Sequence, residues 1–171
     1  EKNIRGQFKK FSIEDKQYAL VTIHRQGNVD SILLHNIIDC VNIAAKHIKV
    51  IFPIHPRTKK QISKLNIKLN NRITIVDPLG YIDFMTLLSH AKMAITDSGG
   101  IQEESMALGI PCIVLRDTTE RPVTLPIGIN TLVGQNKRDF VNVFNNVLQN
   151  KIVTNTYSLW DGKASHRIIK T

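Results

Sequence analysis

The sequence predicts an α/β fold in which helices cover both faces of a parallel sheet. Short apolar runs alternate with helical patterns from residue 18 onward, and such alternation is typical of parallel sheets joined by right-handed crossovers. The runs are apolar throughout rather than at every second residue, as expected of strands that are buried on both faces. These two observations together predict a Rossmann-like three-layer sandwich.

The expected elements follow one another in a regular order. Strands are expected at residues 18–24, 49–55, 73–78, 93–98, 111–116 and, in a shorter form, 131–134. Helices are expected from the apolar spacing at residues 30–46, 57–66, 81–90, 99–108, 137–149 and 161–170. We interpret residues 1–17 as a lead or linker, residues 18–160 as one folded domain and residues 161–171 as a C-terminal helix.

The charge of the chain is positive but unevenly distributed. The 171 residues carry a net charge of +9, whereas residues 73–136 hold seven acidic and only three basic side chains. The sequence has no RNA-recognition aromatic pattern, zinc-finger spacing or basic-helix array. A solvated basic surface is therefore favoured over a nucleic-acid-binding one, and either would attract anionic ligands mildly.

Several other classes of protein are disfavoured by the sequence. Cys40 and Cys112 lie in apolar segments, so we expect buried free thiols in a reducing cytosol and a cytoplasmic protein. No apolar run is long enough to span a bilayer, and the first residues lack the apolar stretch of a secretory signal. Metal-ligand spacing, GxGxxG, Walker A and GxSxG motifs are absent, so neither a metal nor a cofactor is predicted.

Polar residues gather where the expected strands end. In a parallel sheet these carboxyl ends meet at one edge, where ligands bind. The strand ends carry His24-Arg25, His55-Pro56-Arg57, Asp77-Pro78, the segment 96–100 and the segment 116–121. A sheet that binds no ligand has no need for such an edge.

The segment TDSGGIQEE, residues 96–104, is the strongest local signal. Ser98 can cap the following helix, and Gly99 and Gly100 leave its first amide groups open to a phosphate or pyrophosphate. Glu103 or Glu104 could accept hydrogen bonds from sugar hydroxyls. The alternative is a capped helix whose early acids only complement the helix dipole.

Three further candidates each have a structural alternative, and for the aromatic residues that alternative is favoured. The loop RDTTERP, residues 116–122, offers Arg116 or Arg121 to a phosphate, or forms an internal salt-bridge loop. His24 ends the first strand on the ligand edge and is either a structural or a functional histidine. Phe84, with Tyr81, could pack against a nucleobase or simply join the core.

Taken together, the motifs resemble those of the UDP-N-acetylglucosamine 2-epimerase family. They occur in the family's order as TIHRQGN, PIHPR, DPLGYIDF, TDSGGIQEES, GIPCIVLRDTTERP, GINTLVG and WDGKASHRI. The resemblance runs from Tyr18 to Ile169 and corresponds to the C-terminal half of such an enzyme. It implies a GT-B architecture, in which two Rossmann-like domains enclose the active site.

The resemblance also implies roles for particular residues. Ser98, Gly99 and Gly100 are expected at the diphosphate of UDP, and Arg121 beside it. The remaining expectations are Glu104 at the ribose hydroxyls, Phe84 at the uracil and His24 as the family's active-site histidine.

The family interconverts UDP-GlcNAc and UDP-ManNAc by eliminating and re-adding UDP, without a redox cofactor or metal, and is commonly dimeric. The N-terminal domain that supplies the family's catalytic carboxylates has no counterpart in this sequence. We therefore expect the 171 residues to bind UDP without epimerising a sugar on their own. The family usually has glutamate at Gly27, in a segment that helps bind an activating second substrate in bacterial relatives, which places that regulation in question. The family also commonly has a glutamate just after the ERP of residues 120–122, where this sequence has Val123, and nothing in the sequence explains that difference.

Two other functions fit the same residues. The protein could act as an epimerase, or a hydrolysing epimerase, on another UDP-2-acetamido sugar such as a diacetamido uronic acid. It could also be a non-catalytic UDP-binding module. No nucleic acid and no membrane is expected as a partner.

Overall fold

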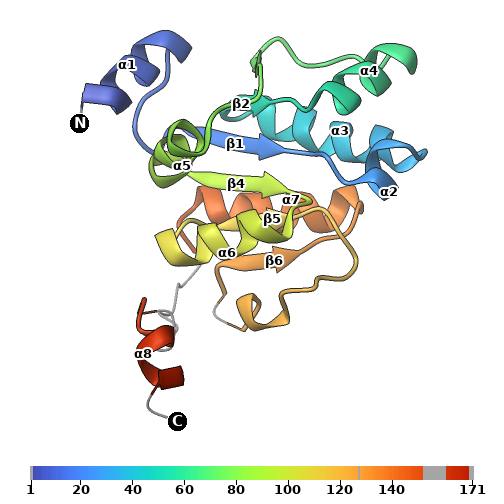
Figure 1. Ribbon diagram of the computed structural model, residues 1–171. Helices are drawn as coiled ribbons and strands as arrows, with labels where there is room; N and C mark the ends of the chain where they lie inside the picture. The colour runs from blue at the N-terminus through green and yellow to red at the C-terminus, as the bar shows by residue number, and fades with distance from the viewer. Residues whose placement is uncertain (1, 127, 152–160, 170–171) are drawn as a thin grey trace.

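The computed structural model describes residues 2–126, 128–151 and 161–169, which form one sheet with helices on both faces (Figure 1). The strands are β1 (Tyr18–Thr22), β2 (Lys49–Pro53), β3 (Ile73–Val76), β4 (Met93–Thr96), β5 (Cys112–Val114) and β6 (Asn130–Leu132). The helices are α1 (Lys2–Phe11), α2 (Gln26–Val29), α3 (Leu33–Ala45), α4 (Pro56–Lys64), α5 (Tyr81–His90), α6 (Gly99–Leu108), the 3-10 turn η1 (Pro122–Thr124), α7 (Lys137–Leu148) and α8 (Ala164–Ile169). Residues 152–160 of the expected domain and residue 170 of the expected last helix lie outside the described residues.

The sheet has the order β3-β2-β1-β4-β5-β6, and every neighbouring pair is parallel. The chain first adds strands on one side of β1 and then returns to add β4, β5 and β6 on the other side. The strand order therefore reverses between β1 and β4. In open parallel sheets, ligands bind beyond the carboxyl ends of the strands at such a reversal.

Two apolar layers sandwich the sheet, as the uninterrupted apolar strands predict. Ala19 and Val21 of β1 pack into the layer that contains α3 and α7, whereas Tyr18 and Leu20 pack into the layer that contains α5. Successive side chains of a strand point to opposite faces, so a strand between two helical layers is apolar at every position. The predicted Rossmann-like three-layer sandwich is confirmed.

The N-terminal lead is a helix rather than a linker. Helix α1 contacts α5, and Phe11 and Ile13 are buried in the same apolar layer as Tyr18. The ring of Phe8 meets that of Tyr18 edge-on, with centroids 6.4 Å apart. The basic residues of the segment 1–17 favour a lead, but its apolar residues recur at helical spacing and indicate a helix.

The helix expected over residues 30–46 is the shorter α3, and a separate helical turn, α2, precedes the expected range. The hydroxyl of Ser31 donates to the carbonyl of Asn28 at 3.3 Å and accepts from the amide of Leu33, also at 3.3 Å. Serine side chains that bond the nearby backbone compete with the helical ladder in this way. Helix α6, in contrast, ends at Gly109 as predicted, because Gly109 adopts a left-handed conformation with φ of 67°.

Both cysteines are buried free thiols, as predicted from their apolar segments. Burial raises the pKa of the Cys40 thiol to about 11 and that of Cys112 to about 12. A thiol reacts as its thiolate, so both groups are shielded by burial and by protonation.

We therefore expect neither cysteine to react with a disulfide reagent such as DTNB in the native protein at about pH 8, far below both pKa values. The same protein in denaturant should titrate both thiols rapidly. Rapid release of even one equivalent of thionitrobenzoate from the native protein would contradict this expectation.

Candidate functional site

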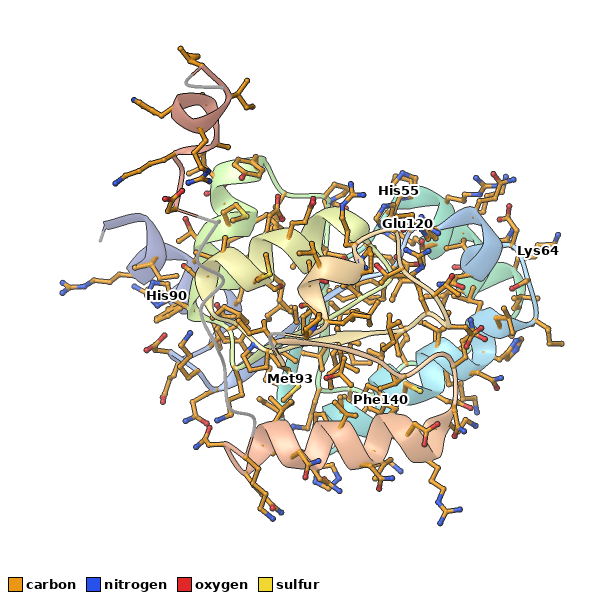
Figure 2. All side chains as sticks on the ribbon, turned by 90° about the horizontal axis from the view of Figure 1, so that it is seen from below. His55, Lys64, His90, Met93, Glu120 and Phe140 are labelled. Carbon is orange, nitrogen blue, oxygen red and sulfur yellow. The ribbon has the colours of Figure 1, made fainter. Side chains whose placement is uncertain are left out.

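The candidate site lies at the carboxyl edge of the sheet, around the reversal between β1 and β4. Thr22 and Thr96 are register partners at the ends of these strands, and their hydroxyl groups are 2.7 Å apart. His55 and Glu120 lie toward one end of the molecule in Figure 2, and His90, at the far end of α5, lies toward the other. The residues that follow β1, β2, β4 and β5 therefore share one edge.

Helix α6 presents a bare N-terminus at this edge. Ser98 occupies the N-cap position but makes no side-chain cap, so the predicted capping bond is absent. Its amide instead donates to Thr96 Oγ1 at 3.0 Å. A Cβ atom at Gly99 would come no closer than 3.8 Å to another atom, and one at Gly100 no closer than 3.9 Å. The start of α6 is therefore not tightly packed around these two glycines, and the N-terminus of a helix is a position where an anion binds well.

Asp97, between β4 and this helix, is fully buried. Its Oδ1 accepts from the amide of His24 at 3.1 Å, and its Oδ2 accepts from the amide of Arg25 at 3.0 Å. Asn28 Nδ2 also donates to Oδ2, at 3.1 Å. The sequence placed Asp97 at a strand end but assigned it no role, because its partners become visible only once β1 and β4 are paired.

His24 and Phe84 lie in one small pocket, although 59 positions separate them in the sequence. The pocket has a volume of about 180 Å³, and its other lining residues are Thr22, Ile23, Pro53, His55, Pro78 and Leu79. Phe84 is partly buried, whereas Tyr81 is 65% exposed. His55 caps α4, since its Nδ1 accepts from the amide of Arg57 at 3.2 Å, which gives this histidine a structural role.

The loop 116–122 contains the internal salt bridges that were one of its two interpretations. Arg116 is 7% exposed and holds Glu120 through two hydrogen bonds, of 2.5 and 2.9 Å. Arg25, from the loop after β1, pairs with the same carboxylate. The hydrogen bonds from Arg116, reinforced by the one from Arg25, hold the pKa of Glu120 well below its usual range. Glu120 therefore ties the loop that follows β5 to the loop that follows β1.

Arg121 is the more accessible arginine of this loop. Its side chain is 41% exposed, and its Nε lies 2.8 Å from Oε1 of Glu103 without being aligned for a hydrogen bond. Burial, together with the neighbouring charge of Glu103, raises the pKa of the partly buried Glu104. Arg121 is thus held near the start of α6 while part of its guanidinium stays open to solvent.

The structure arranges the predicted residues in two groups. Ser98, Gly99, Gly100 and Arg121 cluster at the start of α6, and the Cβ position of Gly99 is 3.8 Å from Arg121 Cγ. His24 and Phe84 form the neighbouring pocket, and Asp97 lies between the two groups. Glu104 lies one turn along α6, outside the residues that line the pocket of His24.

The described residues contain neither a candidate metal cluster nor a candidate membrane-spanning helix. In residues 2–126, 128–151 and 161–169, no group of three or more His, Cys, Asp or Glu side chains could hold a metal ion. Within the same ranges, no helix is long and apolar enough to cross a membrane.

Comparison with known proteins identifies the family. The model of the UDP-N-acetylglucosamine 2-epimerase family matches residues 1–171. This chain belongs to that family. The UDP-N-acetylglucosamine 2-epimerase of Methanocaldococcus jannaschii is 39% identical over 177 aligned positions, which cover 98% of this chain and 47% of the relative. The chain therefore spans about half the length of the curated relatives that it matches.

Solved structures of epimerases have the same fold. The Methanocaldococcus jannaschii enzyme in complex with UDP-GlcNAc and UDP superposes with a TM-score of 0.82 at 36% identity, covering 99% of this chain and 49% of that one. A Pseudomonas aeruginosa relative, named as a UDP-2,3-diacetamido-2,3-dideoxy-D-glucuronate 2-epimerase, is 35% identical over 88% of this chain and 43% of its own. Members of the epimerase family thus differ in the sugar that their names specify.

Gly27 lies in α2. A Cβ atom built at Gly27 would have no other atom within 4 Å. A larger side chain would therefore fit at this position, and the glycine is not required by packing.

The lowered pKa of Glu120 predicts that the stability of the folded chain depends on pH. Because its pKa is lowered in the folded state, its ion pairs stabilise the fold above the ordinary glutamate pKa of 4.5, and this contribution is lost as the pH falls toward the lower folded value. We expect the urea midpoint to fall less between about pH 6 and about pH 3 in Glu120→Gln than in the parent. Glu14→Gln, at an exposed glutamate, is the control and should keep the parent's pH dependence. Equal pH dependence in Glu120→Gln and the parent would contradict this expectation.

Proposed function

We propose that these residues form the UDP-binding half of a UDP-N-acetylglucosamine 2-epimerase. The observation that carries this proposal is the bare N-terminus of α6, with an accessible arginine beside it. Unpaired amides and the positive end of a helix attract a diphosphate, and Arg121 adds a cation that can bond phosphate oxygens. A family in which solved members bind UDP-GlcNAc and UDP supports that choice of ligand.

We propose the remaining contacts from the positions of these residues around the start of α6. Glu104, further along α6, is proposed to accept hydrogen bonds from the ribose hydroxyls, and Phe84 to pack against the uracil. The pocket of Phe84 is lined largely by apolar groups, as a planar base requires. His24 is half exposed and lines the same pocket, and we propose that it lies near both the base and the diphosphate.

This arrangement suits a reaction in which UDP leaves the sugar and later returns. Negative charge grows on the departing diphosphate, and donors that are already oriented toward it stabilise that charge without reorganisation. We propose that the amides of Gly99 and Gly100, with Arg121 and His24, perform this work in the interconversion of UDP-GlcNAc and UDP-ManNAc. The proton transfers at carbon 2 of the sugar are proposed to use residues beyond the half described here.

The proposal extends to the whole protein. We propose a homodimeric, cytoplasmic enzyme that needs no cofactor and acts on a UDP-sugar. A second candidate is an epimerase for another UDP-2-acetamido sugar, which the Pseudomonas aeruginosa relative favours. Assay of a full-length protein on UDP-GlcNAc and on a UDP-diacetamido uronic acid distinguishes the two.

Calorimetric titration of the 171-residue chain with UDP tests the central proposal, and ADP serves as the matched control because it carries the same diphosphate on another base. We expect saturable binding of UDP and at least about 10-fold weaker binding of ADP, from lost base contacts of the order of 1–2 kcal/mol. Equal affinity for UDP and ADP would contradict the proposed uracil pocket and indicate a site that binds only the diphosphate. If neither nucleotide bound, the proposed UDP site would be wrong for this chain.

A substitution at Gly99 separates ligand binding from folding. Ala fits at Gly99 because its Cβ would have only ordinary contacts, so Gly99→Ala should leave the fold intact. The methyl group would occupy the approach to the amides of α6, so UDP affinity should fall about 10-fold or more. Gly6→Ala, in α1, should leave UDP affinity unchanged. If Gly99→Ala bound UDP as tightly as the parent, the proposed position of the diphosphate at the start of α6 would be wrong.

A further inference from the structure

We propose that Asp97 is a positioning residue that holds the loop after β1 and orients the imidazole of His24 toward the ligand. This inference rests on the proposed function, because the ligand toward which His24 would be oriented is the proposed UDP. Its geometry is independent of the ligand.

The carboxylate of Asp97 uses both oxygens on the same loop. Oδ1 accepts from the amide of His24, whereas Oδ2 accepts from the amide of Arg25 and from Asn28 Nδ2. A carboxylate with no exposed surface is costly to bury unless donors surround it, and these three N–H groups supply them. The backbone on both sides of the His24–Arg25 peptide is thereby fixed relative to β4.

A carboxylate is the group that this geometry requires. Asn at position 97 would keep one oxygen and place an NH2 group against an amide N–H of the loop, which leaves two donors facing each other. The amide of Asp97 donates to the carbonyl of Thr22 at 3.3 Å, so its backbone still pairs with β1. Its carboxylate bonds are separate from this pairing and act on the residues that follow β1.

Asp97 Oδ1, which accepts from the amide of His24, also lies near the imidazole ring of His24. His24 Nδ1 lies 3.6 Å from Asp97 Oδ1, too long for a hydrogen bond but close enough for the negative charge to favour a proton on Nδ1. In the neutral ring, Nε2 then carries the lone pair and faces away from Asp97. Because the ring is 48% exposed and lines the pocket of Phe84, Nε2 is the nitrogen available to a bound ligand.

The experiment is 15N NMR of the imidazole nitrogens in histidine-labelled protein, at about pH 9, where an ordinary imidazole is neutral. His24→Gln assigns the signals of His24. We expect the Nδ1-protonated tautomer to predominate for His24 in the parent and to lose its majority in Asp97→Asn. Asp30→Asn is the control. It removes an acid that follows α2 and pairs with Arg57, so it should leave the tautomer of His24 unchanged.

UDP affinity supplies the second readout. Asp97→Asn should bind UDP about 10-fold more weakly than the parent, from the loss of charge-assisted bonds to the loop, while Asp30→Asn should match the parent. If the parent binds UDP but the tautomer and affinity are the same in Asp97→Asn, the positioning role is wrong and the proposed function stands. If the parent does not bind UDP, the proposed function fails, and the tautomer still decides the role of Asp97.

The parent measurement also decides the matter if Asp97→Asn does not fold. A predominant Nε2-protonated tautomer in the parent would overturn the inference without any variant. A predominant Nδ1-protonated tautomer would support it, since Asp97 Oδ1 is the carboxylate oxygen that the structure places beside Nδ1.

Discussion

The parallel pairing of β1 with β4 is the constraint on which the site depends. It joins Thr22 to Thr96 and so brings together two loops that are more than 70 positions apart in the sequence. One loop supplies His24 and Arg25, and the other supplies Asp97 and the start of α6. The strand order reverses at this pair, so the crossovers of the two halves of the sheet diverge from it and leave the carboxyl edge uncovered.

Charge at this edge is balanced inside the protein before any ligand arrives. Glu120 pairs with Arg116 and Arg25, and Glu103 lies beside Arg121. These acids keep the arginines oriented, but they also compete with the phosphates of a nucleotide for the same cations. Arg116 is 7% exposed and its pair with Glu120 is tight, whereas Arg121 is open to solvent. Arg121 is therefore the arginine that a diphosphate can engage without dismantling the loop.

The sequence predicts most of this architecture because local signals mark it. Helix α5 matches its expected range, and α6 begins at Gly99 and ends before Gly109 as expected, because glycine and strand-end residues delimit both helices. The apolar spacing within α1 indicates a helix but not the layer against which it packs, and the break between α2 and α3 depends on side-chain bonds of Ser31 that periodicity does not reveal. Asp97 shows the same limit at the site, since an acid after a strand has no evident partner until the neighbouring strand is known.

The glycines at the start of α6 are explained by a ligand better than by the fold. Glycine forms helices less readily than alanine, although the full penalty of about 1 kcal/mol belongs to a helix interior rather than to the first positions, which Gly99 and Gly100 occupy. Neither has the left-handed φ that would require glycine, since the positive φ values among the described glycines belong to other positions. A Cβ at either position would have only ordinary contacts, so packing does not exclude alanine. The protein therefore gives up helix stability at the one place where its first amides face the open edge of the sheet, and close approach of a phosphate to those amides is a benefit that only glycine permits.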